Sequence, residues 1–495
     1  MADASIALNR FGLGGRPGDD PGTNPKAWLR AQFNRYAPAP QPIAALPGSA
    51  QIATELGDYL EQVRLARREA GAMAPVAPSP AAPMPGADTM MAEAPAATAV
   101  PARQRSEEAM EIRRMATRQG RDHYVAAIGA RAQAAVDSDA PFVERLVHFW
   151  ANHFAVSADN LETTGLSGSL EFEAIRPHVL GKFGDMLHAV ERHPAMLLYL
   201  NQAELVGPNS PAGLVAARAR RPRKIGLNEN LAREILELHT LGVRTGYSQA
   251  DVTEFARAMT GRTVAGLGRA RGESETGRAV FLPRLHEPGA RTILGQSWAQ
   301  PGEAQSEAVL DMLALHPATA RHLATKLARH FAGDDPPAAL IGRLEAVYQK
   351  SGGDLPSVYL ALIDAPECWV AGPVKFKSPW EWSVAAWRAL GNQQLTPNGV
   401  SGLLGQLGQP VWKPGSPAGW DDVAGAWAGP DAVMRRVEAA ERMAQRTRDT
   451  VDARRRAAEL FPGALSPSTV QAIARSESPA QGVALMLVAP EFLRR

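Results

Sequence analysis

The chain has 495 residues, of which 45% are hydrophobic and 21% charged, and its formal net charge is +2. This near-neutral balance argues against a general polyanion binder, so we expect no nucleic-acid partner. The single cysteine, Cys368, excludes an internal disulfide and a cysteine-based zinc site. The longest apolar stretch is far shorter than the roughly 18–20 residues that span a bilayer, so no membrane span is predicted.

The N-terminal sequence has neither a basic region nor an apolar core of the kind found in export signals. We therefore expect a cytoplasmic protein, or a periplasmic one that leaves the cell together with a signal-bearing partner. The glycine-rich turn Phe11–Gly18 has no following Gly-Lys-Ser/Thr and no preceding apolar strand, which favours a plain loop over a phosphate loop.

The first third of the chain is predicted to contain helices at Asn24–Tyr36, Ile52–Ala70 and Glu107–Gly129. Between the last two lie residues 73–103, which are rich in alanine, proline and methionine and almost uncharged. Such a segment buries too little apolar surface to offset ordering, so we interpret it as a disordered insertion. The segment before the insertion is too small to fold alone, so we expect a single domain that spans residues 1–495.

A helix is predicted over Asp139–Ser157, with Pro141 in its first turn. Glu144, His148 and Asn152 follow the spacing i, i+4, i+8 and form one polar stripe. His153 lies 140° from His148 on the helical wheel, so these two histidines do not form the usual i, i+4 metal pair.

The segment Asn228–Val243 is a second helix with two faces. Asn228 is predicted to accept a backbone N–H of the first turn, and Gly242 to end the helix. Asn230, Glu234 and Glu237 form a polar stripe opposite apolar side chains. His239 lies about 160° from Glu237, which predicts a core or hydrogen-bonding role instead.

Further helices are predicted at Tyr247–Gly261, with Ser248 and Asp251 as a capping box, and after Ser378, with Pro379 in the first turn. His316–Phe331 is a strong amphipathic helix whose basic face holds His322, Lys326, Arg329 and His330. Strands are expected only near His286, where Val280–Leu282 would pair with Thr292–Leu294.

Two other segments bear on partners and pockets. The run Arg218–Lys224 holds four arginines and a lysine without interleaved aromatics, which favours a solvated loop over a nucleic-acid arm. The loop Gly408–Trp420 carries three prolines and the indoles of Trp412 and Trp420, so it is expected to cover a core or a pocket. The predicted fold class is all-α, a single irregular multi-helix domain with at most one small β-hairpin.

With these segments in place, the chain resembles the bacterial family catalogued as domain of unknown function 1800. The segments that carry the resemblance are Leu8–Gly12, His148–Ser157, Ala174–His178, Asn228–Val243, Tyr247–Gly261, His316–Phe331, Lys375–Pro379 and Gly408–Trp420. The family has no established activity to carry over. Its members are often encoded beside a sulfatase-like protein of the domain of unknown function 1501 family, which the resemblance implies as a partner.

A buried carboxylate needs a cation, a donor or a metal, so inward-facing Glu234 and Glu237 require partners. One interpretation is a charged network that locks helix packing. The other is a polar pocket for a metal-assisted or acid/base reaction, with Glu234, Glu237 and His148 as catalytic residues and an unidentified divalent metal as a possible cofactor. The residues predicted to bind in it are Asn152, His153, Arg176, His178, Asn228, Asn230, Lys326, Lys375, Trp412 and Trp420.

Two classes of function follow from the sequence. The first is an enzyme whose pocket lies under the loop from Trp412 to Trp420. The second is a non-catalytic helical partner or escort of the sulfatase-like protein. The first requires the Glu144–His148–Asn152 stripe to face the Asn230–Glu234–Glu237 stripe.

Overall fold

The computed structural model describes residues 2–72, 102–219, 226–270, 275–391 and 395–495. Most of the described chain is helical, and its strands form two small antiparallel sheets of two strands each. The predicted all-α class is therefore confirmed. Residues 73–101 of the predicted insertion and residues 220–224 of the arginine-rich run lie outside the described ranges.

The helices of the first half of the chain are mostly short, because prolines and glycines interrupt them. They are α1 (Ala2–Ile6), α2 (Pro25–Ala31), α3 (Gln41–Ala44), α4 (Ser49–Ala72), α5 (Ala102–Asp137), α6 (Pro141–His153), α7 (Leu161–Thr164), α8 (Ser167–Ser169), α9 (Phe183–Glu191), α10 (Pro194–Tyr199), α11 (Pro211–Ala217), α12 (Asn230–Glu234) and α13 (Gln249–Ala258). Three π-helical segments of the described chain extend this set: Ala7–Phe11 after α1, Leu170–Ile175 after α8 and Ile235–His239 after α12.

The second half carries further helices, although the two longest, α4 and α5, lie in the first half. They are α14 (Ala304–Leu315), α15 (Pro317–Ala332), α16 (Ala338–Ser351), α17 (Leu355–Asp364), α18 (Pro379–Leu390), α19 (Pro397–Gln406), α20 (Pro430–Arg446), α21 (Ala453–Leu460), α22 (Pro467–Ala474), α23 (Pro479–Leu487) and α24 (Pro490–Leu493). None of the helices in the described ranges is long and apolar enough to cross a membrane.

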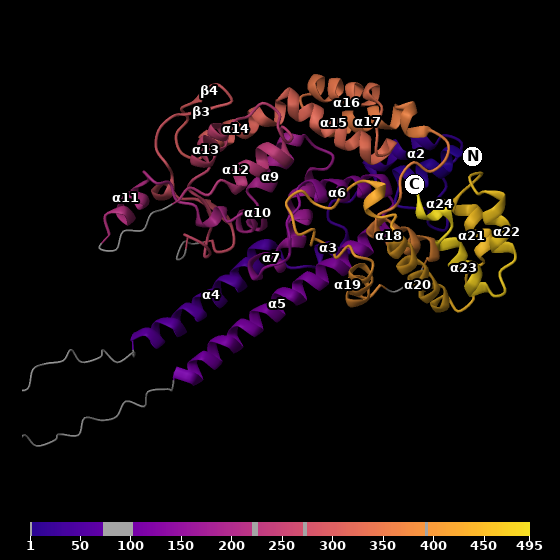
Figure 1. The fold of residues 1–495 in the computed structure, drawn as a ribbon, viewed down its shortest axis with the longest axis horizontal. Coiled ribbons are helices and arrows are strands. Elements are labelled where there is room, and N and C mark those ends of the chain that lie inside the picture. The colour runs from indigo at the N-terminus through magenta and orange to yellow at the C-terminus, as the bar shows by residue number, and fades with distance from the viewer. Residues whose placement is uncertain (1, 73–101, 220–225, 271–274, 392–394) are drawn as a thin grey trace, which may run out of the picture.

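Helices α4 and α5 run side by side and project from the body of the molecule (Figure 1). Their facing sides are joined by polar contacts: Glu55 on α4 meets both Gln119 and His123 on α5 at 2.7 Å. The inner half of α5 turns apolar and joins the core through Ile128 and Ala132, both fully buried. One face of α5 therefore anchors the pair to the rest of the fold.

The predicted helix starts at Ser248 and Ser378 are confirmed. Each serine hydroxyl accepts the backbone N–H three residues on, and the acidic side chain at that position accepts the serine's own N–H. The acid is Asp251 in the first case and Glu381 in the second. This reciprocal arrangement satisfies two N–H groups that a helix start leaves free.

The predicted strand pairing is wrong. β2 (Ala279–Phe281) pairs with β1 (Arg262–Val264), and β3 (Arg291–Ile293) pairs with β4 (Gln296–Trp298), both antiparallel. The strands of the second pair are connected by a tight turn at Leu294 and Gly295, both of which have positive φ. β3 therefore pairs with the strand that follows it directly in the chain. β2 pairs with β1, the strand that follows α13.

Two large clusters of buried apolar side chains form the core of the described chain. The first gathers around α6, α9, α15 and α17, with Phe142, Trp150 and Phe331 fully buried in it. The second gathers around α5, α18, α20 and α23, with Trp382 fully buried. Side chains of both clusters, Phe149 of the first and Trp380 of the second, line one cavity between them.

Candidate functional site

The candidate site is this cavity, called here the central cavity, with a volume of about 120 Å³. Helices α5, α6, α15 and α18 and the loop from Gln409 to Asp422 supply its walls. Its polar lining residues are Arg131, Arg145, His148, Asn152, His153, Lys326, His330, Ser378, Glu381, Gln409, Asp421 and Asp422. Asp421 is exposed and Trp420 half-buried, so the loop side forms the rim toward solvent.

On the α6 wall, His148 is held by an indole. Trp380 Nε1 donates to His148 Nδ1 at 3.1 Å, with the two rings perpendicular. Because Nδ1 accepts, the hydrogen of the neutral ring is on Nε2, and that atom has no hydrogen-bond partner among the described residues. Burial, and after it the nearby Arg131 and Arg176, hold the pKa of His148 well below its ordinary value. His148 is therefore a neutral hydrogen-bond donor.

At the end of α6, five residues after His148, His153 contacts Lys326 of α15. His153 Nε2 lies 3.1 Å from the carbonyl oxygen of His239, and His153 Nδ1 lies 2.9 Å from Lys326 Nζ. The carbonyl can only accept, so Nε2 carries the hydrogen and Nδ1 accepts from the lysine. Burial lowers the pKa of Lys326 to about 8, with Asp422 acting against the shift and Arg329 adding to it.

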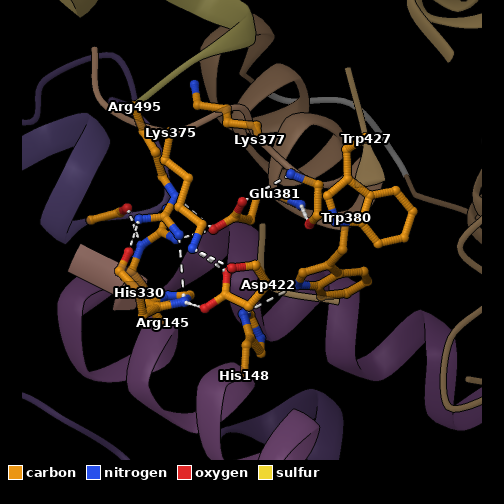
Figure 2. Close-up of polar contacts among 12 residues, drawn as sticks. Arg145, His148, His330, Lys375, Lys377, Trp380, Glu381, Asp422, Trp427 and Arg495 are labelled. Atoms are coloured by element: carbon orange, nitrogen blue, oxygen red, sulfur yellow. Dashed lines mark hydrogen bonds and ion pairs between the residues drawn. The ribbon is translucent and has the colours of Figure 1, made fainter. Parts of the chain in front are cut away.

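Four residues after Lys326, His330 forms a pair with Asp422 from the loop (Figure 2). His330 Nδ1 lies 2.9 Å from Asp422 Oδ2, and Lys375 Nζ lies 2.8 Å from Asp422 Oδ1. Burial alone would raise the pKa of Asp422, but His330, Lys375 and Arg495 hold it well below its ordinary value. Asp422 is therefore a carboxylate whose two oxygens each face a different partner.

Glu381 at the start of α18 collects three donors. Its carboxylate pairs with the guanidinium groups of Arg145 and Arg495 and accepts the N–H of Ser378 at 2.9 Å. Burial opposes ionisation, yet the two arginines hold the pKa of Glu381 far below its ordinary value. Arg495 also donates to the carbonyl oxygen of His330 at 2.5 Å. This ionised cluster fixes α15 and α18 relative to each other at the edge of the cavity (Figure 2).

Aromatic rings supply the rest of the wall. The guanidinium of Arg131 lies 4.1 Å from the ring centre of Trp380 and 5.4 Å from that of Trp412. Glu171 binds Arg131 through both carboxylate oxygens, at 3.0 and 2.8 Å, and accepts from Trp412 Nε1 at 3.1 Å. Stacking on a fixed guanidinium gives these indoles one orientation.

Comparison with known families identifies the chain. The family model described as protein of unknown function (DUF1800) matches residues 6–494. The chain belongs to this family. Neither the search of curated proteins nor the search of solved structures found a match.

The structure brings six of the predicted site residues of this DUF1800 protein together around the central cavity. They are His148, Asn152, His153, Lys326, Trp412 and Trp420. Lys375 lies directly behind them, because its buried amine binds the carboxylate of Asp422. The prediction that the 408–420 loop covers a core or a pocket is confirmed.

Glu234 and Glu237 are not part of that lining. Glu237 pairs with Arg233 at 3.5 Å, one turn earlier on its own helix. Glu234 is half-buried, and burial, followed by the nearby Glu237, raises its pKa. The carboxylates that line the cavity with His148 and Asn152 in this DUF1800 protein are instead Glu381, Asp421 and Asp422.

Arg176 is engaged elsewhere. Its Nη1 and Nη2 bind the two oxygens of Glu144 at 2.6 and 3.0 Å, and both side chains are 1% exposed. Glu144 thus belongs to a closed ion pair, which is the helix-locking network that the sequence left open. His178 is half-buried in the 3₁₀ turn that follows Arg176.

The helix from Asn230 departs from the predicted wheel. It is α-helical to Glu234 and π-helical from Ile235 to His239, so 100° per residue does not hold in its second half. Asn228 accepts the N–H of Asn230 at 2.9 Å, as expected for a residue before a helix start, and Asn230 is exposed. Neither asparagine lines the central cavity.

His239 ends the π segment in a buried position. Its Nδ1 lies 2.7 Å from Glu191, and both side chains are fully buried. The predicted hydrogen-bonding role is therefore confirmed. The carbonyl oxygen of His239 also accepts a hydrogen bond from His153 Nε2. His239 therefore orients a cavity residue without lining the cavity itself.

Sequence reasoning missed the roles of Asp422, Glu381 and Arg145. His330 was placed on the basic face of its helix, four residues after Lys326, but not in the site. The local signal that joins His330 to Lys326 is their i, i+4 spacing on one helix. For Asp422 the only signal was its place two residues after Trp420.

The sequence allowed a divalent metal site without identifying the metal. Among the described residues, no group of three or more His, Cys, Asp or Glu side chains is arranged to hold a metal ion. The donors that meet at the central cavity are instead engaged in pairs: His330 with Asp422, and His153 with Lys326.

Proposed function

We propose that this DUF1800 protein is an enzyme that moves protons on a small polar molecule held in the central cavity. His330, oriented by Asp422, and Lys326, held by His153, are the two proton-transfer groups. The observation that carries the proposal is the state of His330 Nε2. This nitrogen is buried, belongs to a residue that lines the cavity, and has no hydrogen-bond partner in the described part of the chain.

The tautomer of His330 follows from its neighbours. Asp422 is ionised and only accepts, and it lies closer to Nδ1, at 2.9 Å, than Arg495 Nη2 does, at 3.4 Å. Nδ1 therefore carries the hydrogen and Nε2 the lone pair. Burial lowers the pKa of His330 to about 4, with Asp422 acting against the shift, so the ring is neutral at pH 7. A neutral imidazole fixed by a carboxylate is the arrangement of a general base.

Lys326 supports the same function from the next turn of α15. Its pKa of about 8 lies close to neutral pH, and groups with such a pKa exchange protons most effectively. The aromatic walls and the paired charges supply the mixed apolar and polar lining typical of small-molecule sites. The acid/base enzyme that the sequence allowed is thus supported, with His330 and Lys326 in the roles first given to Glu234 and Glu237.

The test incubates the purified protein with the fraction below 1 kDa of an extract from its host. Mass spectrometry then follows every compound over time. We expect the wild type to deplete one compound and form another, and His330→Gln to lose that conversion. His178→Gln is the matched control, because His178 does not line the cavity.

The alternative function, an escort of the sulfatase-like protein, predicts a different result. No compound would change with the wild type, and a stable one-to-one complex would form with the sulfatase-like protein whether or not His330 is replaced. That pair of results would overturn the enzyme proposal.

A further inference from the structure

The amine of Lys326 has an unusual partner for a lysine in a cavity. Its hydrogen bond goes to the lone pair of an imidazole, and no carboxylate of the described residues lies within 4.0 Å of it. The residues behind His153 keep that imidazole in place: its other nitrogen donates to His239, whose ring is bound by Glu191. A neutral acceptor stabilises the ammonium far less than an anion does.

The protonation states agree with this geometry. His153 has a pKa well below its ordinary value, first because it is buried and then because Lys326 lies beside it. It therefore presents a permanent acceptor to the lysine at neutral pH. With a pKa of about 8, about a tenth of the Lys326 amine is neutral at pH 7, against less than about a thousandth for an unperturbed lysine.

We infer that Lys326 is a carbonyl-binding residue, whose Nζ condenses with an aldehyde or ketone held in the central cavity to form an imine. The inference rests on the proposed function and names its substrate class. The three carboxylates that line the cavity, Glu381, Asp421 and Asp422, are matched by three cationic side chains, Arg131, Arg145 and Lys326, so its charges balance and favour an uncharged ligand. The class is therefore a small, uncharged carbonyl compound with hydroxyl groups for the polar walls.

The step balances without any other reactant. The amine nitrogen attacks the carbonyl carbon, a C–N bond forms, and the C=O electron pair moves to oxygen. His153 Nδ1 accepts one proton from the nitrogen and passes it to that oxygen, which becomes a hydroxyl. His153 then moves the second nitrogen proton to the hydroxyl, the C–O bond breaks, water leaves, and the C=N bond forms. Hydrolysis by the reverse path releases the amine, and nothing is oxidised or reduced.

The chain offers an internal control for the test. Lys377 has a pKa that burial lowers to about 7, but it is 1% exposed and does not line the central cavity. Lys350 is exposed at the surface. Comparing the three lysines separates a low pKa from access to the cavity.

The experiment treats the full-length protein with glycolaldehyde and sodium cyanoborohydride at pH 7, which reduces any imine to a stable adduct. Peptide mass spectrometry then gives the rate at each lysine. We expect Lys326 to be modified at least about tenfold faster than Lys350, because its neutral fraction is larger. We also expect it to be modified faster than Lys377, because only Lys326 lines the central cavity. Equal or slower modification of Lys326 would overturn the inference.

The variant His153→Gln tests the proton step. It should slow modification of Lys326 and leave the rate at Lys350 unchanged, and the wild-type comparison stands even if this variant folds poorly. The result is independent of the turnover test. Turnover that depends on His330 without an adduct at Lys326 would reject the imine and keep the proton-transfer function. An adduct without such turnover would keep the carbonyl site and reject His330 as the base.

Discussion

The side chain of Asn152 and the backbone of Trp420 hold each other by two hydrogen bonds. Asn152 Nδ2 donates to the carbonyl oxygen of Trp420 at 2.8 Å, and the Trp420 N–H donates to Asn152 Oδ1 at 2.7 Å. This contact joins α6 to the loop 268 residues later in the chain. It fixes the rim of the central cavity, because the loop has few other bonds to α6.

Replacing Asn152 should loosen this loop without unfolding the protein. Asn152→Ala removes both hydrogen bonds, so we expect the free energy of local opening of residues 408–422 to fall by about 1–2 kcal/mol. Hydrogen exchange measured by mass spectrometry should be faster in that peptide alone. Asn152→Asp keeps the acceptor and should show a smaller effect.

A substitution on the other side of the contact gives an independent check. Gly419 has a φ of +78°, and a Cβ there would lie 2.3 Å from the backbone oxygen of Asn152. Gly419→Ala should therefore open the same peptide. Unchanged exchange in both variants would show that this contact does not hold the loop.

The buried pair of Glu144 and Arg176 should behave as a structural lock. Arg176→Met leaves a carboxylate buried without a cation, and we expect a loss of about 3–5 kcal/mol in the free energy of unfolding, measured with urea. Adding Glu144→Gln should recover part of the loss, because no uncompensated charge remains. The surface pair of exposed Arg343 and half-buried Glu367 is the control, and Arg343→Met should cost no more than about 1 kcal/mol.

Lys377 should be a site where a substitution stabilises the fold. Its amine is buried, lies 4.7 Å from the ring centre of Phe492, and has no hydrogen-bond partner in the described ranges. Lys377→Met keeps the shape and removes the charge, so we expect a gain on the order of 2 kcal/mol at pH 7. Lys375→Met is the matched control and should destabilise, since it leaves Asp422 with one partner fewer.

The pH dependence of the Lys377 effect has a defined sign. Its pKa falls from 10.5 to about 7 on folding, so between these values the unfolded chain binds more protons and stability rises with pH. The advantage of Lys377→Met should therefore shrink as pH rises from 7 toward 10. A constant advantage over that range would contradict the assignment.

Acid should destabilise the fold through its buried histidines. The pKa of His330 is lowered to about 4, so between about pH 4 and its ordinary value of 6.5 the unfolded chain binds more protons. Stability contributed by the neutral ring is then lost as pH falls through this range. His330→Gln should reduce the slope of unfolding free energy between pH 5 and 6 by up to about 1.4 kcal/mol per pH unit. An unchanged slope in urea titrations would show that His330 is already protonated.

Local features were readable from the sequence because they depend on neighbours in the chain. The capping residues Ser248 and Ser378 act on N–H groups three residues away, and the proline and glycine positions that end helices need no tertiary contact. The spacing of His148 and Asn152 placed both on one polar face, where the structure has them. The two tryptophans of the 408–420 loop indicated a cover, and the loop covers the central cavity.

Residue spacing could not predict which carboxylates line the central cavity. A helical wheel says which side chains share a face, but not which face they meet, and the change to π geometry after Glu234 alters the wheel itself. Strand pairing failed for a similar reason, since short strands pair with whichever edge the fold brings near.

The sequence by itself determined a predominantly helical fold, several helix starts, and four of the polar side chains that line the candidate site, His148, Asn152, His153 and Lys326. Only the tertiary structure decided which acids complete that site. Asp422 reaches His330 across 92 residues, and Glu381 reaches Arg145 across 236. Such contacts depend on how two cores pack against each other, and helix periodicity carries no information about that packing.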